Sequence, residues 1–184
     1  MKKILVSIVL AFALALTGST TDSTIETEVV VNPWACGSTI TYEGKRYPTV
    51  EIGTQCWMKE NLDVGTMINS SQDPSNNNEI EKYCYNNDLA NCETYGGLYQ
   101  WSEAMHYVST QGTQGICPSG WHIPTIFEFL SLESYVSDLA TKIINESAKS
   151  GYTYTNTTGF SALFGGFRFI DDGDFHGLGG STTF

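Results

Sequence analysis

The sequence predicts an α+β domain with short antiparallel strands near its beginning and two main helices later in the chain. Residues 40–52 alternate apolar and polar side chains around a central Glu-Gly-Lys, a pattern typical of two strands joined by a tight turn. Apolar residues recur at intervals of three and four over residues 98–108, as on one face of a helix. A second helix is predicted over residues 125–144, because Thr125 and Glu128 have the spacing of a capping box.

The first eighteen residues have the form of a secretory signal peptide. Lys2 and Lys3 precede a run of thirteen mostly apolar residues, ILVSIVLAFALAL, and a small Thr-Gly pair. Roughly 20 apolar residues are needed to cross a membrane, so this run is short for a transmembrane helix. We therefore expect an exported protein, secreted or held at the cell surface, that is not an integral membrane protein once residues 1–18 are removed.

Residues 16–19, LTGS, resemble the bacterial lipobox Leu-x-Gly-Cys, but Ser19 stands where the lipidated cysteine would be. A serine hydroxyl is a poor substitute for a thiolate nucleophile, so we expect no lipid there. The alternative is that Ser19 is an ordinary small residue of the signal peptide. A linker rich in Thr and Ser is expected over residues 19–32, and the folded domain over residues 33–184.

The composition is strongly acidic. The chain has 20 Asp and Glu residues against 9 Lys and Arg residues, a net charge of −11, and loss of the two signal-peptide lysines would make it more negative. Nucleic-acid binding requires a positive surface, so we expect no nucleic-acid partner. The acidic surface predicts solubility, with cation affinity as the alternative.

Five cysteines in an exported chain are expected to pair and to leave one over. Cys84 and Cys92 flank the stretch YNNDLAN, which favours a tight turn, and we predict a disulfide between them. Cys36, Cys56 and Cys117 are expected to supply one further pair, and the sequence leaves open which two join. No Cys-x-x-Cys pair is present for zinc or redox chemistry, so the cysteines are interpreted as structural.

Residues 115–129, GICPSGWHIPTIFEF, allow two interpretations. Cys117 and His122 could act as a nucleophile and its base, but no orienting Asp or Asn is evident in the sequence. The interpretation we prefer is structural: Cys117 ties the loop to another part of the fold, Trp121 enters the core, and the capping box starts the helix. We therefore expect no catalytic residues here.

Three motifs carry a family resemblance: TVEIGTQCWMKENL, YGGLYQWSEAM and GICPSGWHIPT with a following Glu. In this order and at these distances they resemble the Fibrobacter succinogenes major paralogous domain family, over about residues 36–173. The resemblance implies an exported bacterial domain of largely unassigned function, often on lipoproteins or cell-surface proteins. The element Gly-Trp-His-Ile-Pro-Thr-x-x-Glu is also similar to one in formylglycine-generating enzymes, which implies a C-type-lectin-like fold. The paired active-site cysteines of those enzymes have no counterpart near the C-terminus, so their chemistry is not carried over.

The C-terminal part departs from the family pattern. Family members usually continue through a Trp-rich strand with a Ser-Ser pair to a final strand carrying Val-Arg-Cys, whereas this chain ends in STTF. The resemblance therefore implies that a strand pair and a cysteine are missing. Their absence would account for the odd cysteine count and would leave an open sheet edge.

Asp171, Asp172 and Asp174 surround Gly173 and are candidate calcium ligands, because hard carboxylate oxygens suit this ion. The full EF-hand pattern is lacking, and Asp-Gly between two apolar stretches is also typical of a hairpin turn, which we prefer. Asn86, Asn87 and Asp88 of the 84–92 loop are also possible ion ligands, and for them too we prefer a turn. Apart from this calcium candidate, no cofactor is expected.

We expect a non-enzymatic, exported surface module that recognises a glycan or a protein. Two alternatives stay open: a divergent enzyme related to the formylglycine-generating enzymes, and a purely structural protein of the cell envelope. His106, in the first predicted helix, has no evident partner and is expected to be structural. Several aromatic residues could stack on sugars or belong to the core: Trp34, Tyr42, Tyr83, Tyr85 and Tyr99.

Overall fold

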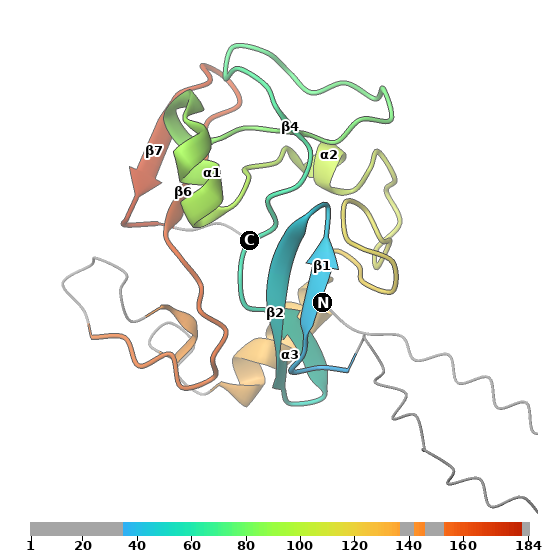
Figure 1. The fold of residues 1–184 in the computed structure, drawn as a ribbon, viewed down its shortest axis with the longest axis vertical. Helices are drawn as coiled ribbons and strands as arrows, with labels where there is room; N and C mark the ends of the chain where they lie inside the picture. The colour runs from blue at the N-terminus through green and yellow to red at the C-terminus, as the bar shows by residue number, and fades with distance from the viewer. Residues whose placement is uncertain (1–34, 137–141, 146–152, 182–184) are drawn as a thin grey trace, which may run out of the picture.

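The computed structural model describes residues 35–136, 142–145 and 153–181 (Figure 1). It has helices and small sheets, in agreement with the predicted α+β class. The strands are β1 Thr39–Tyr42, β2 Lys45–Ile52, β3 Gln55–Met58, β4 Thr66–Met67, β5 Glu81–Lys82, β6 Gly165–Arg168 and β7 Phe175–Leu178. The helices are the 3-10 turn η1 Tyr85–Asn87, α1 Leu89–Tyr95, α2 Trp101–Ala104 and α3 Ile126–Tyr135. None of the helices in these described ranges is long and apolar enough to cross a membrane.

The first three strands form an antiparallel sheet in the order β1-β2-β3. Tyr42 pairs with Lys45 across a two-residue turn, which confirms the predicted hairpin. Ile52 pairs with Gln55 across a second two-residue turn. Strand β3 was not predicted from the sequence, because four residues are too few to show a clear period.

Two apolar clusters lie against this sheet. Alternate residues of a strand point to opposite faces, so Trp57 and Met58 enter different clusters. The first cluster packs the sheet against α3 with Ile52, Trp57, Leu132, Val136, Ile143, Ile144, Phe160 and Ala162. The second contains Ile40, Tyr47, Cys56, Met58, Cys117 and Trp121.

Helix α3 begins as the sequence predicts. The Thr125 side chain accepts a hydrogen bond from the Glu128 N–H, and the Glu128 carboxylate accepts one from the Thr125 N–H at 2.9 Å. The helix begins at Ile126 and ends at Tyr135. The prediction extended it to residue 144, and residues 137–141 of that range lie outside the described part of the chain.

The helix predicted over residues 98–108 is wrong in extent. Only α2 is helical, and Trp101, one of the apolar residues of that pattern, is 66% exposed. His106 and Tyr107 have positive φ values of 52° and 56°, a conformation that ends a right-handed helix. His106 is exposed and lies outside the helix in which it was predicted.

The second part of the molecule surrounds the β6–β7 hairpin. Figure 1 shows β6 and β7 beside α1, away from α3 and the ends of β1 and β2. Residues 84–92, predicted as a tight turn, form η1 and most of α1, where the Asp88 side chain accepts a hydrogen bond from the Ala90 N–H. Arg168 of β6 donates hydrogen bonds to the Ser70 carbonyl oxygen and stacks on the Tyr83 ring at 4.3 Å.

Candidate functional site

The cysteines form two disulfides and leave one thiol. Cys84 is joined to Cys92, the pairing predicted from their spacing. Cys36 is joined to Cys56, which ties β3 to the segment before β1. Cys117 is free and 0% exposed. The prediction that Cys117 ties its loop to another part of the fold is therefore wrong, and the loop is held by packing instead.

The stretch around Cys117 and His122 is structural in its contacts. Burial raises the pKa of the Cys117 thiol to about 12, which leaves almost no thiolate at neutral pH. His122 contacts Glu128, with Nε2 2.9 Å from a carboxylate oxygen. That carboxylate is part of the Thr125 capping box. Both residues thus belong to the core and the helix start.

The three aspartates predicted as candidate calcium ligands lie in the loop between β6 and β7. Asp171, Asp172 and Asp174 are exposed, and the Asp174 N–H donates to the Asp172 carboxylate at 2.9 Å. Within the described residues no group of three or more His, Cys, Asp or Glu residues could hold a metal ion. The structure has the hairpin turn that was preferred to a calcium site, because β6 and β7 pair on either side of this loop.

The other polar candidates are used by the fold. The Asn87 side chain accepts from the Ser70 N–H and donates to the Ser70 hydroxyl. Asp88 caps α1 through the Ala90 N–H. Asn86 has a positive φ of 56° within the 3-10 turn, a conformation that Asn adopts more readily than most residues.

The tyrosines considered for sugar stacking are mostly structural. Tyr83 is buried and donates to the Gln72 carbonyl oxygen. Tyr85 packs on Phe175 at 5.2 Å between ring centroids. Tyr42 packs against the second apolar cluster. Trp34 lies outside the described residues.

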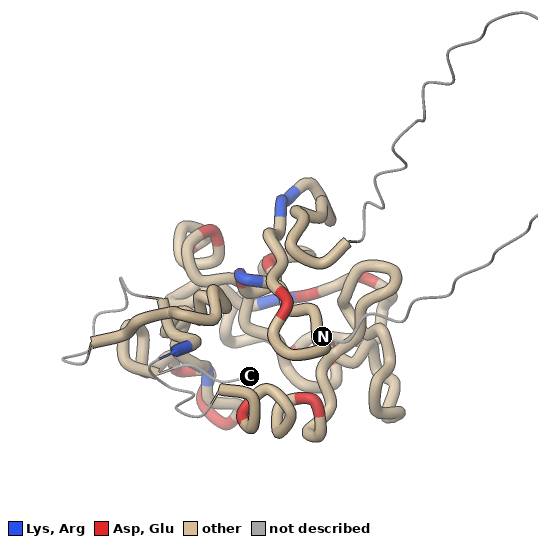
Figure 2. Tube along the Cα trace, turned by 90° about the horizontal axis from the view of Figure 1, so that it is seen from below, with Lys and Arg blue, Asp and Glu red and all other residues tan. Residues whose placement is uncertain are grey.

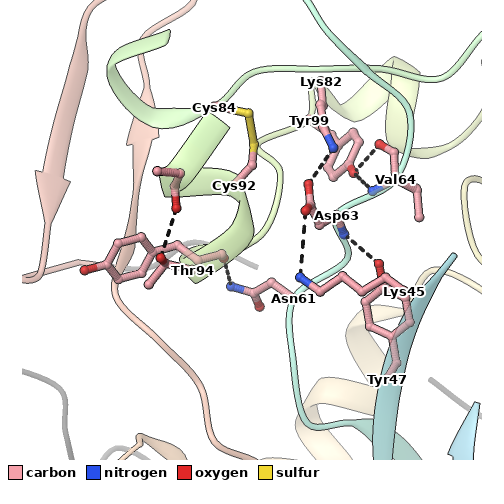
Figure 3. Close-up of polar contacts among 12 residues, drawn as sticks. Lys45, Tyr47, Asn61, Asp63, Val64, Lys82, Cys84, Cys92, Thr94 and Tyr99 are labelled. Atoms are coloured by element: carbon pink, nitrogen blue, oxygen red, sulfur yellow. Dashed lines mark hydrogen bonds and ion pairs between the residues drawn. A yellow bond between two sulfur atoms is a disulfide. The ribbon is translucent and has the colours of Figure 1, made fainter. Parts of the chain in front are cut away.

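Tyr99, the last of the tyrosines considered for sugar stacking, is bound to the backbone of Val64. Its hydroxyl donates to the Val64 carbonyl oxygen and accepts from the Val64 N–H, both at 2.8 Å (Figure 3). Burial raises the pKa of this hydroxyl. Asp63, which precedes Val64 in the chain, forms ion pairs with Lys82 and Lys45. These contacts fix the segment that follows β3 against the β4–β5 part of the molecule.

A groove of about 560 Å³ is the candidate functional site, and we call it the aromatic groove. Pockets of this size suit small ligands or single side chains of a partner. Its lining comes from the end of β3 with residues 59–62, from the Tyr99–Trp101 segment, from the loop before α3, and from residues 160–162. Its large apolar lining residues include Trp57, Trp101, Ile123, Ile126, Phe129 and Phe160.

The inner part of the groove contains an unpaired donor. Trp57 is 3% exposed and lies 5.6 Å from both Phe129 and Phe160, measured between ring centroids. Its indole N–H is buried without a hydrogen-bond partner. Such a group costs free energy unless an acceptor satisfies it.

The outer part of the groove is apolar and exposed. Trp101 at its edge is 66% exposed, and Ile126 on the opposite helix is 59% exposed. Phe127 and Leu130 continue the exposed apolar surface along α3. Contiguous exposed apolar surface of this kind marks interaction sites.

The shape of the groove depends on one close backbone approach. Gly115 has a φ of +53°, and a Cβ there would collide with the Ala104 carbonyl oxygen and lie 2.9 Å from the Ile123 side chain. Ala104 and Ile123 both line the groove. This site was not predicted from the sequence, because the spacing of the apolar residues assigned Trp101 to the apolar face of a helix over residues 98–108. The only sequence signal was the density of large apolar residues in the YGGLYQWSEAM and GWHIPTIFEF stretches.

Comparisons with known proteins identify the family. The family model of the Fibrobacter succinogenes major domain matches residues 50–184, a range that includes β3, the aromatic groove and the β6–β7 hairpin. No curated protein and no solved structure matched the chain. The chain therefore belongs to the Fibrobacter succinogenes major domain family, as the three sequence motifs predicted.

Proposed function

We propose that this protein is an exported, non-enzymatic recognition module that binds a partner macromolecule, glycan or protein, in the aromatic groove. The single observation that carries the proposal is the mostly exposed side chain of Trp101 in a groove that the polar residues Lys59, Glu60 and Asn61 also line. An aromatic anchor beside a few placed polar groups is typical of recognition sites.

The signal-peptide pattern supports export, and the acidic composition weighs against anionic partners. Figure 2 shows acidic residues in several separate stretches of the described trace. General repulsion of acidic polymers fits this arrangement better than a local cation site does. The C-type-lectin-like form implied by the resemblance remains part of the proposal, since that architecture displays recognition surfaces.

The enzymatic alternative has less support. The thiol of Cys117 is buried, and its raised pKa of about 12 suppresses the thiolate that nucleophilic catalysis needs. His122 is bonded to Glu128 in the helix cap. We expect His122→Ala to lower the melting temperature and leave groove binding by the folded fraction unchanged. A variant that melts like the parent and loses a turnover would favour an enzyme.

The test is a comparison of the parent with Trp101→Ala on a glycan array and on a displayed peptide library. The side chain is mostly exposed, so its loss removes binding surface and little stability. We expect one of the two panels to bind the parent and to lose most of its signal with Trp101→Ala. If the parent binds neither panel, the proposal fails and a purely structural envelope role is favoured. If Trp101→Ala binds as the parent does, the aromatic groove is not the binding site and the proposal also fails.

A further inference from the structure

Trp101 lines two hollows of the molecule. One is the aromatic groove, and the other, which we call the second hollow, has a volume of about 380 Å³. The second hollow is lined by Tyr83, by residues 98–102 and by residues of β6 and the loop after it. The exposed Trp101 side chain is therefore shared by a concavity against α3 and a concavity against β6.

Exposed apolar side chains occur in both hollows. Ile126, in the lining of the aromatic groove, is 59% exposed, and Ile170, in the lining of the second hollow, is 69% exposed. Nearby chain positions that add to this exposed apolar surface are Phe127, Leu130 and Phe169. Exposed apolar surface around a concavity marks an interaction site, and here it accompanies two of them.

The planar polar side chains of the two hollows are already used within the fold. In the aromatic groove, the Asn61 amide donates to a carbonyl oxygen of α1 at 2.8 Å. In the second hollow, the Gln100 amide donates to the Asp73 carboxylate at 3.1 Å. The Arg168 guanidinium, in the same hollow, donates to the Ser70 carbonyl oxygen.

This use of the polar groups favours a protein partner over a glycan. A sugar presents mainly hydroxyl groups, which need hydrogen-bonding partners at the site. The core of a protein interface consists instead of aromatic and apolar side chains that fill pockets of the other partner. The two hollows offer apolar walls and the exposed Trp101 ring, which match the second kind of ligand.

The charges around the hollows favour basic residues in that partner. Exposed carboxylates line the hollows, bond to their lining or follow it in the chain: Glu60, Asp73, Asp171 and Asp172. The two linings contain the cations Lys59 and Arg168, and the whole chain has a net charge of −11. Like charges exclude wrong partners, and opposite charges steer the right one to its site. A second copy of this chain and an anionic membrane are therefore disfavoured.

We propose that the two hollows together bind a partner protein through an apolar segment flanked by Lys or Arg, with one apolar side chain in each hollow and Trp101 between them. This inference rests on the proposed function, because it names the class of partner for the aromatic groove and adds the second hollow to the site. A few aromatic and apolar anchors near the centre of an interface supply most of its affinity. Trp101 is that central anchor, since it lines both hollows.

The two hollows differ in the side chain that they suit. The aromatic groove is the larger, at about 560 Å³, and its lining includes the rings of Phe129 and Phe160. Aromatic pairs gain free energy beyond the area that they bury, so we expect Trp, Tyr or Phe as the anchor there. The second hollow is smaller and has Leu98 and Ile170 in its lining, so we expect Leu, Ile or Met.

The first experiment selects random twelve-residue peptides displayed on phage against the immobilised full chain. We expect the selected peptides to share two apolar positions, one of them aromatic, with Lys or Arg beside them. A synthetic selected peptide should bind about fivefold more weakly at high salt than at low salt, because ions screen the attraction of its basic residues. Neutral or acidic selected peptides, or binding that salt does not weaken, would overturn the proposal of a basic partner.

The second experiment tests each hollow with one substitution. Ile126→Ala removes a wall of the aromatic groove and Ile170→Ala a wall of the second hollow, whereas Leu89→Ala is the matched control, at an exposed residue that lines neither. Thermal melts first establish that the three variants fold, as expected for exposed positions. We expect each isoleucine variant to weaken binding of the selected peptide about fivefold to tenfold, and Leu89→Ala to change it within about twofold. A loss with Ile126→Ala alone would confine the site to the aromatic groove and overturn the inference.

The third experiment assigns the anchors of the peptide to the hollows. Each apolar position of the peptide is replaced by Ala and tested against the parent and both isoleucine variants. We expect the aromatic position to couple with Ile126→Ala and the other apolar position with Ile170→Ala, so that each paired change costs less than the sum of the single ones. Coupling of one peptide position with both isoleucines would contradict an anchor in each hollow.

The outcomes separate this inference from the function on which it rests. Glycan binding that depends on Trp101, with no peptide selected, would overturn a protein partner and leave the recognition module intact. No binding to either panel would remove both. A dimer in sedimentation that Trp101→Ala dissociates would mean that a second copy occupies the hollows. Binding to phosphatidylcholine vesicles that Trp101→Ala abolishes would mean a membrane surface, and either of these results also overturns the proposal.

Discussion

The molecule has two regions that are held together by different forces. The sheet region, β1 to β3 with α3, is organised by two apolar clusters on opposite faces of the sheet. The hairpin region, β4–β5 with η1, α1 and β6–β7, is organised largely by polar contacts between residues far apart in sequence. Arg168, for example, bonds to Ser70, 98 residues away. An apolar cluster tolerates small shifts, whereas a polar contact needs its partner in place.

The regions meet at Asp63. Its carboxylate contacts Lys45 of β2 in the sheet region and Lys82 of β5 in the hairpin region (Figure 3). Lys82 is buried, so it depends on this partner for its charge. The candidate groove lies at the same boundary, since its lining draws on β3, on residues 59–62 and on the Tyr99–Trp101 segment. The comparison of the two regions can be tested at five points, taken from the largest expected effect to the smallest.

Asp63→Asn should have the largest effect. It removes the charge that compensates the buried Lys82 ammonium, and breaking a buried pair from one side costs about 3–5 kcal/mol. Urea unfolding should therefore show a large loss, with the hairpin region opening first in hydrogen exchange. Glu79→Gln, at an exposed acidic residue, is the control. A loss for Asp63→Asn no larger than that of the control would mean that the regions are joined by packing alone.

The two disulfides allow a direct comparison of the regions. Cys36–Cys56 has a sequence separation of 20 and Cys84–Cys92 one of 8. The chain-entropy relation then predicts losses of about 3.3 and about 2.5 kcal/mol when each pair is replaced by serine. Urea unfolding of the two double variants measures both. A larger loss for Cys84 and Cys92 would show that the hairpin region depends on its bridge more than chain entropy predicts.

Arg168→Met should destabilise the hairpin region by about 1.5–3 kcal/mol. The substitution keeps apolar length but removes the hydrogen bonds to the Ser70 carbonyl oxygen and the stacking of the guanidinium on Tyr83. Hydrogen exchange should report faster opening of the hairpin region, with the amides of β2 and β3 unchanged. Equal acceleration in both regions would mean that they unfold as one unit.

The cap of α3 gives the sheet region its pH dependence. Burial opposes ionisation of Glu128, but hydrogen bonds from the Thr125 N–H, from His122 and from the Thr125 hydroxyl outweigh it and hold the pKa of the carboxyl below its ordinary 4.5. The stability from this shift is present above pH 4.5 and is lost as the pH falls through the lower, folded-state pKa.

Glu128→Gln should flatten this part of the acid-unfolding curve, and Thr125→Ala should cost about 1 kcal/mol at neutral pH. Thermal melts between pH 2 and pH 7 measure both effects. Exposed Glu133 of the same helix provides the matched control, Glu133→Gln. An unchanged acid curve for Glu128→Gln would mean that the cap is equally formed in the unfolded chain.

Trp101→Ala should have the smallest effect on stability, within about 0.5 kcal/mol, because the side chain is mostly exposed. Replacement of the buried Trp57, which lines the same groove, by Ala should by contrast cost about 3–5 kcal/mol of stability. Melting curves of the two variants establish the contrast. A large loss for Trp101→Ala would place it in the core, as the sequence pattern suggested, and remove the exposed anchor from the candidate site.

The sequence by itself determined the parts of this protein that depend on neighbours in the chain. The β1–β2 hairpin, the Thr125 capping box and the Cys84–Cys92 bridge each involve residues at most nine positions apart, so local spacing was enough to predict them. The family was also accessible from the sequence, because its motifs are short and ordered.

Tertiary structure alone decided the rest. Strand β3 exists because β2 provides a partner, and the 98–108 segment is helical for only four residues because its packing turns the chain at His106. The same packing exposes Trp101 and brings it to one groove with Trp57, Phe129 and Phe160. Of these, Trp57 and Phe160 are 103 residues apart in the sequence. A period in the sequence can identify an apolar face, but which apolar faces find partners depends on contacts between distant segments, and no local pattern encodes them.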